Sequence, residues 1–326
     1  MNTMSTKIRI GVMGCARVAQ RSTIPAIKEL SNKFELVVIA SRTIEKAQAL
    51  AAEFKCKAVE GYDQLINIPD LDAIYMPLPT GLHKQWIIKA LRQGKHVYAE
   101  KSMAYCYADA CEMVKLADEK KLALMEGYMF QYHSQHQLVL DSLNNGKIGE
   151  VRHFFSSFGF PQLDSTNFRY DEKLGGGALL DAAGYPVRAA HFVLGEGFKI
   201  KSATLFHNNE GTNIFGSAFM SNDKGVGASL AFGLNNFYQC RYEIWGEKGK
   251  IIAERAFTPR FDFSPKIIIE TNKGSDIIQA KPDNHFIKAF VEFYNICNGK
   301  NIKKHYTQIL EQSQSLELIR QYSKKV

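Results

Sequence analysis

The 326-residue chain is longer than one ordinary domain and fits two, and its composition, 45% hydrophobic and 23% charged, is that of a globular protein. The net charge is +8, but the 41 Lys and Arg residues are scattered, which argues against a nucleic-acid binder and suits anionic small ligands. No apolar run reaches the ~18 residues of a transmembrane helix. The N-terminal residues lack the apolar stretch of a signal peptide, so we expect a cytoplasmic protein that does not bind membranes.

The six cysteines form no C-x-x-C pair and no metal-like spacing with histidine. In a reducing compartment such cysteines are free thiols. We therefore expect neither disulfides nor a metal site.

The first 125 residues alternate between two kinds of pattern. Strands are predicted at 7–14, 34–41, 71–76, 95–99 and 123–127, and helices at 17–31, 43–54, 82–93 and 108–119. This alternation predicts a parallel, doubly wound sheet.

The pattern changes after about residue 126. Helices are predicted at 134–146 and 178–194, and closely spaced strands at 151–160, 199–207, 213–221, 225–234, 238–246, 249–255 and 266–271. Short turns between strands favour an antiparallel sheet. The expected fold class is α/β, with a dinucleotide-binding domain at 1–125 and an α+β substrate-binding and oligomerisation domain with a large, mainly antiparallel open sheet at 126–326.

A degenerate dinucleotide motif follows the first strand. The G-x-G-x-x-G/A fingerprint appears as G-x-A-x-x-A, with Gly14 at the tight turn and Ala16 where the backbone approaches a pyrophosphate. The motif alone is weak, and an ordinary β-α turn is the alternative, but its place between a strand and a helix favours a cofactor site. The predicted cofactor contacts in this turn are Gly14, Cys15, Ala16, Arg17 and Val18.

The end of the second strand indicates which dinucleotide binds. An NAD site places an acid there to bind the ribose 2′-hydroxyl, whereas this chain has Ser41 and Arg42. A guanidinium beside a hydroxyl suits a 2′-phosphate. We predict NADP(H) in preference to NAD(H), with a solvated helix-start arginine as the alternative.

Two further segments carry candidate catalytic groups. Tyr-Ala-Glu-Lys-Ser places Glu100 and Lys101 at the carboxyl end of a strand. Gly-Gly-Gly-Ala-Leu-Leu-Asp-Ala-Ala-Gly-Tyr-Pro places Asp181 and Tyr185 four residues apart, predicted on one face of a helix. Singly, the lysine could be a solvated strand end, the aspartate a helix-terminus residue, and the tyrosine a core residue.

These motifs together resemble the glucose–fructose oxidoreductase/inositol dehydrogenase (Gfo/Idh/MocA) family over nearly the whole chain. That family has E-K-P after a strand and G-G-x-L-x-D-x-x-x-H/Y in its second domain, and the tyrosine at 185 and neighbouring text most resemble nucleotide-linked hexose 3-ketoreductases. Ser102 departs from the family proline, and we expect a looser loop there because serine has a freer φ.

The resemblance implies an NADPH-dependent reductase of a sugar keto group. Tyr185 is expected to donate the proton and Lys101 to stabilise the alkoxide, with the reverse assignment open, while Asp181 orients Lys101 or sugar hydroxyls. Further cofactor candidates are Pro77, Leu78, His83 and Glu100, and further substrate candidates are Gln131 and Arg169. The alternatives are a helix-terminus hydrogen bond for His83, a loop-fixing role for Glu100, packing for Gln131 and simple surface placement for Arg169.

Several functions remain open from the sequence. The leading one is reduction at C3 of a nucleotide-linked keto-deoxyhexose. The alternatives are an NADP-dependent dehydrogenase of a free aldose or cyclic trans-diol, and a non-catalytic dinucleotide-binding sensor. The resemblance also implies a homodimer or homotetramer formed through the outer face of the second sheet, where we expect Leu230, Phe232 and Leu234 to be exposed.

Overall fold

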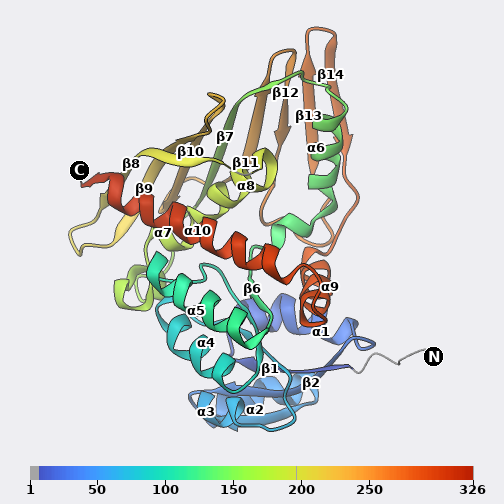
Figure 1. The fold of residues 1–326 in the computed structure, drawn as a ribbon, viewed down its shortest axis with the longest axis vertical. Coiled ribbons are helices and arrows are strands. Elements are labelled where there is room, and N and C mark those ends of the chain that lie inside the picture. The colour runs from blue at the N-terminus through green and yellow to red at the C-terminus, as the bar shows by residue number, and fades with distance from the viewer. Residues whose placement is uncertain (1–6, 196, 326) are drawn as a thin grey trace. The chain divides into compact units, whose positions relative to one another are not determined.

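The computed structural model describes residues 7–195 and 197–325. The chain divides into two compact units. The first comprises the chain up to Gly127 together with Phe286–Glu311, and the second comprises Tyr128–His285 and the chain from Gln312 onward. Figure 1 identifies the elements of both units. None of the described helices is long and apolar enough to cross a membrane.

The first unit contains a parallel sheet of six strands within its described residues, in the order β3-β2-β1-β4-β5-β6. Its strands are β1 (Ile8–Met13), β2 (Phe34–Ser41), β3 (Lys57–Glu60), β4 (Ala73–Met76), β5 (His96–Ala99) and β6 (Leu124–Glu126). Its helices are η1 (Ala19–Thr23, a π-helical turn), α1 (Ile24–Glu29), α2 (Ile44–Phe54), α3 (Tyr62–Ile66), η2 (Thr80–Leu82), α4 (His83–Arg92) and α5 (Tyr107–Lys120). The doubly wound parallel sheet predicted from the sequence is confirmed.

A late segment of the chain completes this unit. The helix α9 (His285–Cys297) packs Phe290 against Tyr98, with ring centroids 5.0 Å apart, and stacks Phe293 on Phe34. The predicted second domain, 126–326, included Phe286–Glu311, which the structure assigns to the first unit instead. The physical reason is that a parallel sheet must be covered on both faces, and α9 supplies the cover that Phe34 and Tyr98 require.

The second unit is built on a sheet of nine strands among the residues that the structure describes, in the order β14-β13-β12-β11-β7-β10-β9-β8-β15. These are β7 (Val151–Phe160), β8 (Lys199–His207), β9 (Asn213–Ser221), β10 (Gly227–Leu234), β11 (Gln239–Gly246), β12 (Gly249–Ala253), β13 (Lys266–Thr271), β14 (Gly274–Gln279) and β15 (Ser323–Lys325). Only β10 with β7 and β15 with β8 pair in parallel among these strands. The mainly antiparallel sheet is therefore confirmed.

The helical segments of the second unit include η3 (Met129–Tyr132), α6 (Ser134–Asn144), η4 (Phe168–Tyr170), η5 (Glu172–Leu174), α7 (Ala178–Asp181) and α8 (Gly184–Leu194). The helix α10 (Ile302–Tyr322) passes from the first unit into the second at Gln312. The single helix predicted over 178–194 is wrong, because the chain turns at Ala182 and Ala183 between α7 and α8. Asp181 and Tyr185 consequently lie on separate helices.

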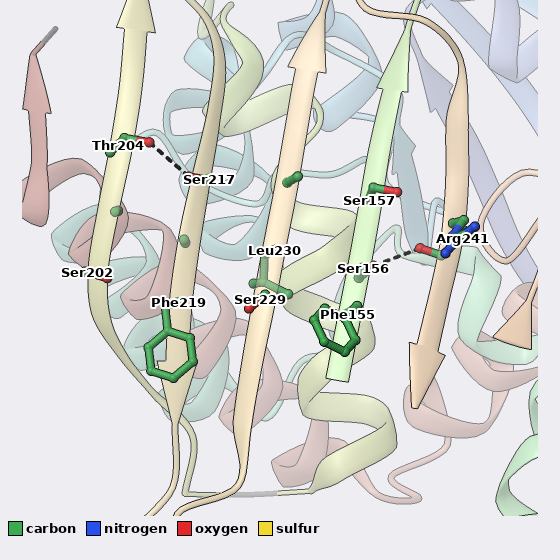
Figure 2. Close-up of a pocket in the computed structure, with 13 residues that line it drawn as sticks. Phe155, Ser156, Ser157, Ser202, Thr204, Ser217, Phe219, Ser229, Leu230 and Arg241 are labelled. Carbon is green, nitrogen blue, oxygen red and sulfur yellow. Dashed lines mark hydrogen bonds between the residues drawn. The ribbon is translucent and has the colours of Figure 1, made fainter. Parts of the chain in front are cut away.

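The two faces of the second sheet differ in cover. Leu230, Phe232 and Leu234 are 2%, 3% and 0% exposed, and α8 packs on their strand. The expectation that these residues form an exposed outer face is therefore wrong. The alternation of side chains along a strand shows which residues share a face, but it does not show which face the helices cover. The outer face carries the partly exposed rings of Phe155 and Phe219, which flank a shallow cavity of about 490 Å³ in Figure 2.

Candidate functional site

The turn after β1 has the geometry that a dinucleotide turn requires. Gly14 has φ +115°, and a Cβ there would stand 3.0 Å from the Leu78 side chain. The left-handed φ and this close approach both favour glycine. Cys15 and Ala16 are half-buried and Arg17 is exposed. The helical segment then begins as the π-turn η1 and not as one regular helix.

The end of β2 collects positive charge beside this turn. Ser41 and Lys46 both lower the pKa of the Cys15 thiol, although burial outweighs them and raises it overall. Burial likewise raises the pKa of Tyr62, and the exposed Arg42 acts against that shift. Two cations and a hydroxyl therefore stand at the position where an NAD site would carry an acid. This donor set fits a 2′-phosphate.

The loops after β4 and β5 are tied together by His83. Its ring lies between two backbone carbonyls, with Nε2 2.8 Å from Leu78 O and Nδ1 3.2 Å from Met103 O. The ring is fully buried, and burial lowers its pKa. His83, the first residue of α4, thus links the loops after β4 and β5, and a direct contact with the cofactor stays a prediction.

Glu100 and Lys101 have different surroundings. The Tyr75 hydroxyl donates to the Glu100 carboxylate over 2.7 Å, and burial raises the pKa of Glu100 despite the nearby Lys101. Lys101 is half-buried, and the peptide bond between Lys101 and Ser102 is cis. Glu100 therefore has a structural partner on β4, which agrees with the loop-fixing alternative.

The loop that departs from the family proline is well packed. Ser102 is 1% exposed, and the Met103 amide donates to the Glu126 carboxylate over 2.6 Å. Glu126, at the end of β6, is itself buried. The Met103 carbonyl faces the His83 ring and the Met103 amide donates to Glu126, so the loop has contacts on both sides, and a looser loop at Ser102 stays a prediction.

In the second unit, the two glycines directly before α7 leave no room for a side chain. A Cβ on Gly176 would meet Arg169 O at 2.6 Å, and one on Gly177 would meet the Asn213 side chain at 2.4 Å. Asn213 uses that position to accept from the Leu179 amide over 2.7 Å, which satisfies an N–H group at the start of α7. The glycines therefore let the Arg169 loop and β9 close around Asp181.

Asp181 is paired within this unit. Arg169 donates from Nε to Asp181 Oδ2 over 2.7 Å, and the guanidinium lies over the ring of Phe168, 4.8 Å from its centroid. The side chains are 29% and 11% exposed. Asp181 was expected to orient Lys101 or substrate hydroxyls, and the partner observed within its own unit is Arg169.

Tyr185 stands in a cage of aromatic rings. Its ring centroid is 4.5 Å from that of Phe158, 5.5 Å from Tyr128, 5.6 Å from Phe257 and 6.0 Å from Phe130. Its side chain is almost completely buried. A phenol so enclosed is shielded from water, which strengthens any hydrogen bond it makes.

Gln131 and His136 are engaged by other side chains. Arg188 donates from Nε to Gln131 Oε1 over 2.8 Å, and His136 faces the Tyr242 hydroxyl and Ala256 O at 2.8 and 2.9 Å. His136 is therefore a core residue. Gln131 is bonded to α8 through Arg188, and its contact with substrate stays a prediction.

Comparison with known proteins identifies the family. Residues 8–128 match the family model "Oxidoreductase family, NAD-binding Rossmann fold", and residues 136–252 match "GFO/IDH/MocA C-terminal domain". The chain belongs to the GFO/IDH/MocA oxidoreductase family. The resemblance read from its motifs is thereby confirmed.

Individual relatives are also similar over most of their length. A dTDP-3,4-didehydro-2,6-dideoxy-alpha-D-glucose 3-reductase from Saccharopolyspora spinosa is 41% identical over 89% of this chain and 87% of the relative. The crystal structure of KijD10, a 3-ketoreductase from Actinomadura kijaniata in complex with NADP and TDP-benzene, has a TM-score of 0.95 and 36% identity over 98% of this chain and 99% of that one. A D-xylose 1-dehydrogenase (NADP(+)) from Haloferax volcanii is 28% identical over 82% of this chain and 80% of the relative.

In this GFO/IDH/MocA oxidoreductase, the predicted site residues fall into two groups. The cofactor candidates and Lys101 belong to the first unit, and the other substrate candidates, Gln131, Arg169, Asp181 and Tyr185, belong to the second. Joint action of Lys101 and Tyr185 on one substrate stays a prediction.

Several residues that hold these candidates in place were not predicted from the sequence, among them Glu126, Tyr128, Arg188 and Gln312. Tyr128 could have been suspected from its place beside the domain boundary. Gln312 gave no local signal, because its partner Gly184 is 128 residues away.

Proposed function

We propose that this protein is an NADPH-dependent reductase of the C3 keto group of a dTDP-linked 3,4-didehydro-2,6-dideoxyhexose. The observation that carries the proposal is the similarity to 3-reductases of that substrate, at 41% identity over 89% of the chain. The KijD10 structure matches 98% of the chain, which takes in both the dinucleotide turn and the Asp181–Tyr185 segment, so the proposal does not rest on the cofactor domain alone.

The choice of NADPH rests on the end of β2. We expect Arg42 to pair with the 2′-phosphate, with Ser41 as a second donor and Lys46 nearby. A diphosphate would lie against the turn that Gly14 makes possible, next to the backbone at Ala16. When bound, the cofactor supplies the hydride that converts the carbonyl to an alcohol.

The remaining chemistry belongs to the chain. The carbonyl oxygen gains negative charge as it is reduced and must receive a proton. The Tyr185 phenol can donate that proton from its aromatic cage, and the Lys101 ammonium can stabilise the charge, with the reverse assignment open. The Asp181–Arg169 pair offers further hydrogen-bonding atoms for sugar hydroxyls or phosphate, and Gln131 is a further candidate.

Two other functions receive less support. A dehydrogenase of a free aldose or cyclic diol would resemble the relative named for D-xylose, whose identity to this chain is only 28%. A non-catalytic sensor would have no need for Lys101, Asp181 and Tyr185 together. We therefore place both after the reductase.

The deciding experiment is turnover by the purified protein. It should oxidise NADPH with the dTDP-linked keto sugar, give a product reduced at C3 by NMR, and act poorly with NADH or with the free sugar. Tyr185→Phe should lose most of kcat while the affinity for NADPH is unchanged. Turnover of free aldoses alone would support the dehydrogenase, and NADPH binding without turnover of any carbonyl substrate would support the sensor.

We also propose a cytoplasmic homodimer or homotetramer that uses the outer face of the second sheet. Its support is the row of partly exposed aromatic residues on that face, such as Phe155, Phe219 and Trp245. In Figure 2, Ser229 lies on the strand between the rings of Phe219 and Phe155, and the hydrogen-bonded pair Thr204 and Ser217 lies on the adjacent strands β8 and β9. Sedimentation analysis of wild type and Trp245→Lys tests this: loss of the oligomer supports it, and an unaltered oligomer contradicts it.

A further inference from the structure

One buried glutamine fixes both the backbone and a ring beside Tyr185. Gln312, 0% exposed, donates from Nε2 to the Gly184 carbonyl over 2.9 Å and to the Tyr128 hydroxyl over 3.2 Å. Gly184 is the first residue of α8 and precedes Tyr185. Tyr128 packs edge-on against the ring of Tyr185, with an interplanar angle of 87°.

Gly184 and the Tyr128 hydroxyl are so close that no side chain fits between them. A Cβ on Gly184 would stand 1.7 Å from the Tyr128 hydroxyl, so that hydroxyl occupies the space a side chain would need. The rings of Phe130, Phe158 and Phe257, which also pack on Tyr185, have no polar atom through which a hydrogen bond could anchor them. Tyr128 therefore differs from these phenylalanines, because a hydrogen bond from Gln312 to its hydroxyl fixes the position of its ring.

A glutamine at position 312 lowers the stability of the folded chain, because part of its amide is buried without a partner among the described residues. Its Oε1 is buried and has no hydrogen-bond partner among the described residues. A buried amide with an unsatisfied oxygen lowers stability relative to an apolar side chain of similar size. The benefit of a glutamine must then come from the two groups that its amide holds.

We propose that Gln312 is a positioning residue for Tyr185, acting through Gly184 and Tyr128. The inference rests on the proposed function, in which Tyr185 acts on the keto sugar. By holding the start of α8 and the edge-on ring, Gln312 fixes the direction of the Tyr185 phenol before substrate binds.

A double-mutant cycle distinguishes positioning from a merely structural role. Gln312→Met keeps a similar length and removes both donated bonds, and it should lower kcat/KM for the sugar about tenfold in the wild-type background. In the Tyr185→Phe background the same change should lower it less than about twofold. An equal loss in both backgrounds, or no loss in the wild type, overturns the proposal.

The matched control lies on the same helix. Ser315 Oγ is 3.0 Å from His191 Nε2, near the other end of α8. Ser315→Ala should leave kcat/KM unchanged, and a loss equal to that of Gln312→Met would mean that any loosening of α8 suffices. If Gln312→Met does not fold, Tyr128→Phe replaces it, with an expected loss of about threefold that also disappears in the Tyr185→Phe background.

A readout without turnover separates this inference from the proposed function. 3-Fluorotyrosine placed at position 185 should give one sharp ¹⁹F resonance in the wild type and a shifted or broadened one in Gln312→Met. An identical resonance in both overturns the positioning role even if the enzyme is active. A changed resonance in a protein without turnover supports positioning and leaves only the proposed function contradicted.

Discussion

Arg169 and Asp181 form a short ion pair, with 2.7 Å between Nε and Oδ2, at the end of α7. The aspartate is 11% exposed, so most of its hydration is lost on folding. Such a carboxylate needs its cationic partner. The pair therefore fixes the glycine-rich loop to the helix that ends beside the Tyr185 segment, so it has a structural role whether or not it contacts substrate.

Removing the negative charge of this pair should destabilise the protein. Asp181→Asn keeps an oxygen that can accept from Arg169, but the charge-assisted part of the bond is lost, at about 1–2 kcal/mol in the free energy of unfolding. Denaturant titration measures this. Asp262→Asn is the control, because its pair with Arg260 is 50% and 79% exposed and should contribute nothing measurable. Equal effects of the two changes would contradict the assignment.

A methyl group at Gly184 should not be tolerated. Gly184→Ala would place its Cβ 1.7 Å from the Tyr128 hydroxyl, so ring and helix must separate. We expect a loss of about 2 kcal/mol or more in unfolding free energy, measured by thermal and denaturant unfolding. Adding Tyr128→Phe removes the clashing oxygen and should recover part of that loss. A fully stable Gly184→Ala protein would show that the close approach is not rigid.

Local signals predicted the parts of the site that sit at strand ends. Gly14, Arg42 and Lys101 follow apolar runs, and the carboxyl ends of parallel strands meet at one edge of a sheet. The hydrogen-bond partners of the strand-end residues could not be predicted from local sequence. The bond between Tyr75 and Glu100, for example, depends on the strand order, which places β4 beside β5.

The errors in the second unit have one physical origin. Alanine is the best helix former, yet the chain turns at Ala182 and Ala183. Leu230 and Phe232 alternate correctly on β10, but α8 covers their face. In both cases tertiary packing decided between local alternatives of similar free energy.

Cofactor preference should follow the charge at position 42. Arg42→Ala should raise KM for NADPH about 10- to 100-fold and leave KM for NADH nearly unchanged, because only the 2′-phosphate loses its partner. Steady-state kinetics with both cofactors measures the ratio. Arg92→Ala removes the same charge from the exposed end of α4 and is the matched control. A parallel rise of KM for both cofactors would place Arg42 outside the 2′-phosphate site.

Acid should destabilise the protein through two buried histidines, His136 and His285, and the half-buried His191. Burial lowers the pKa of His136 and His285 to about 3 and that of His191 to about 4; His133 adds to the first two shifts and Arg188 to the third. Asp283 opposes the shift of His285. The folded pKa values lie below the unfolded value of about 6.5, so the unfolded chain binds more protons between the two. The stability that these neutral rings provide is present above about pH 6.5 and is lost as the pH falls towards 4.

The contribution of one ring can be isolated. Each histidine should reduce the unfolding free energy by up to about 1.4 kcal/mol per pH unit below about pH 6.5. His136→Gln should therefore lower stability at neutral pH, because the bonds to Tyr242 and Ala256 O are altered, and should flatten the pH dependence by about that slope. Urea titrations of both proteins between about pH 7.5 and about pH 5 measure the two slopes. Parallel slopes would mean that His136 binds its proton as readily in the folded chain as in the unfolded one.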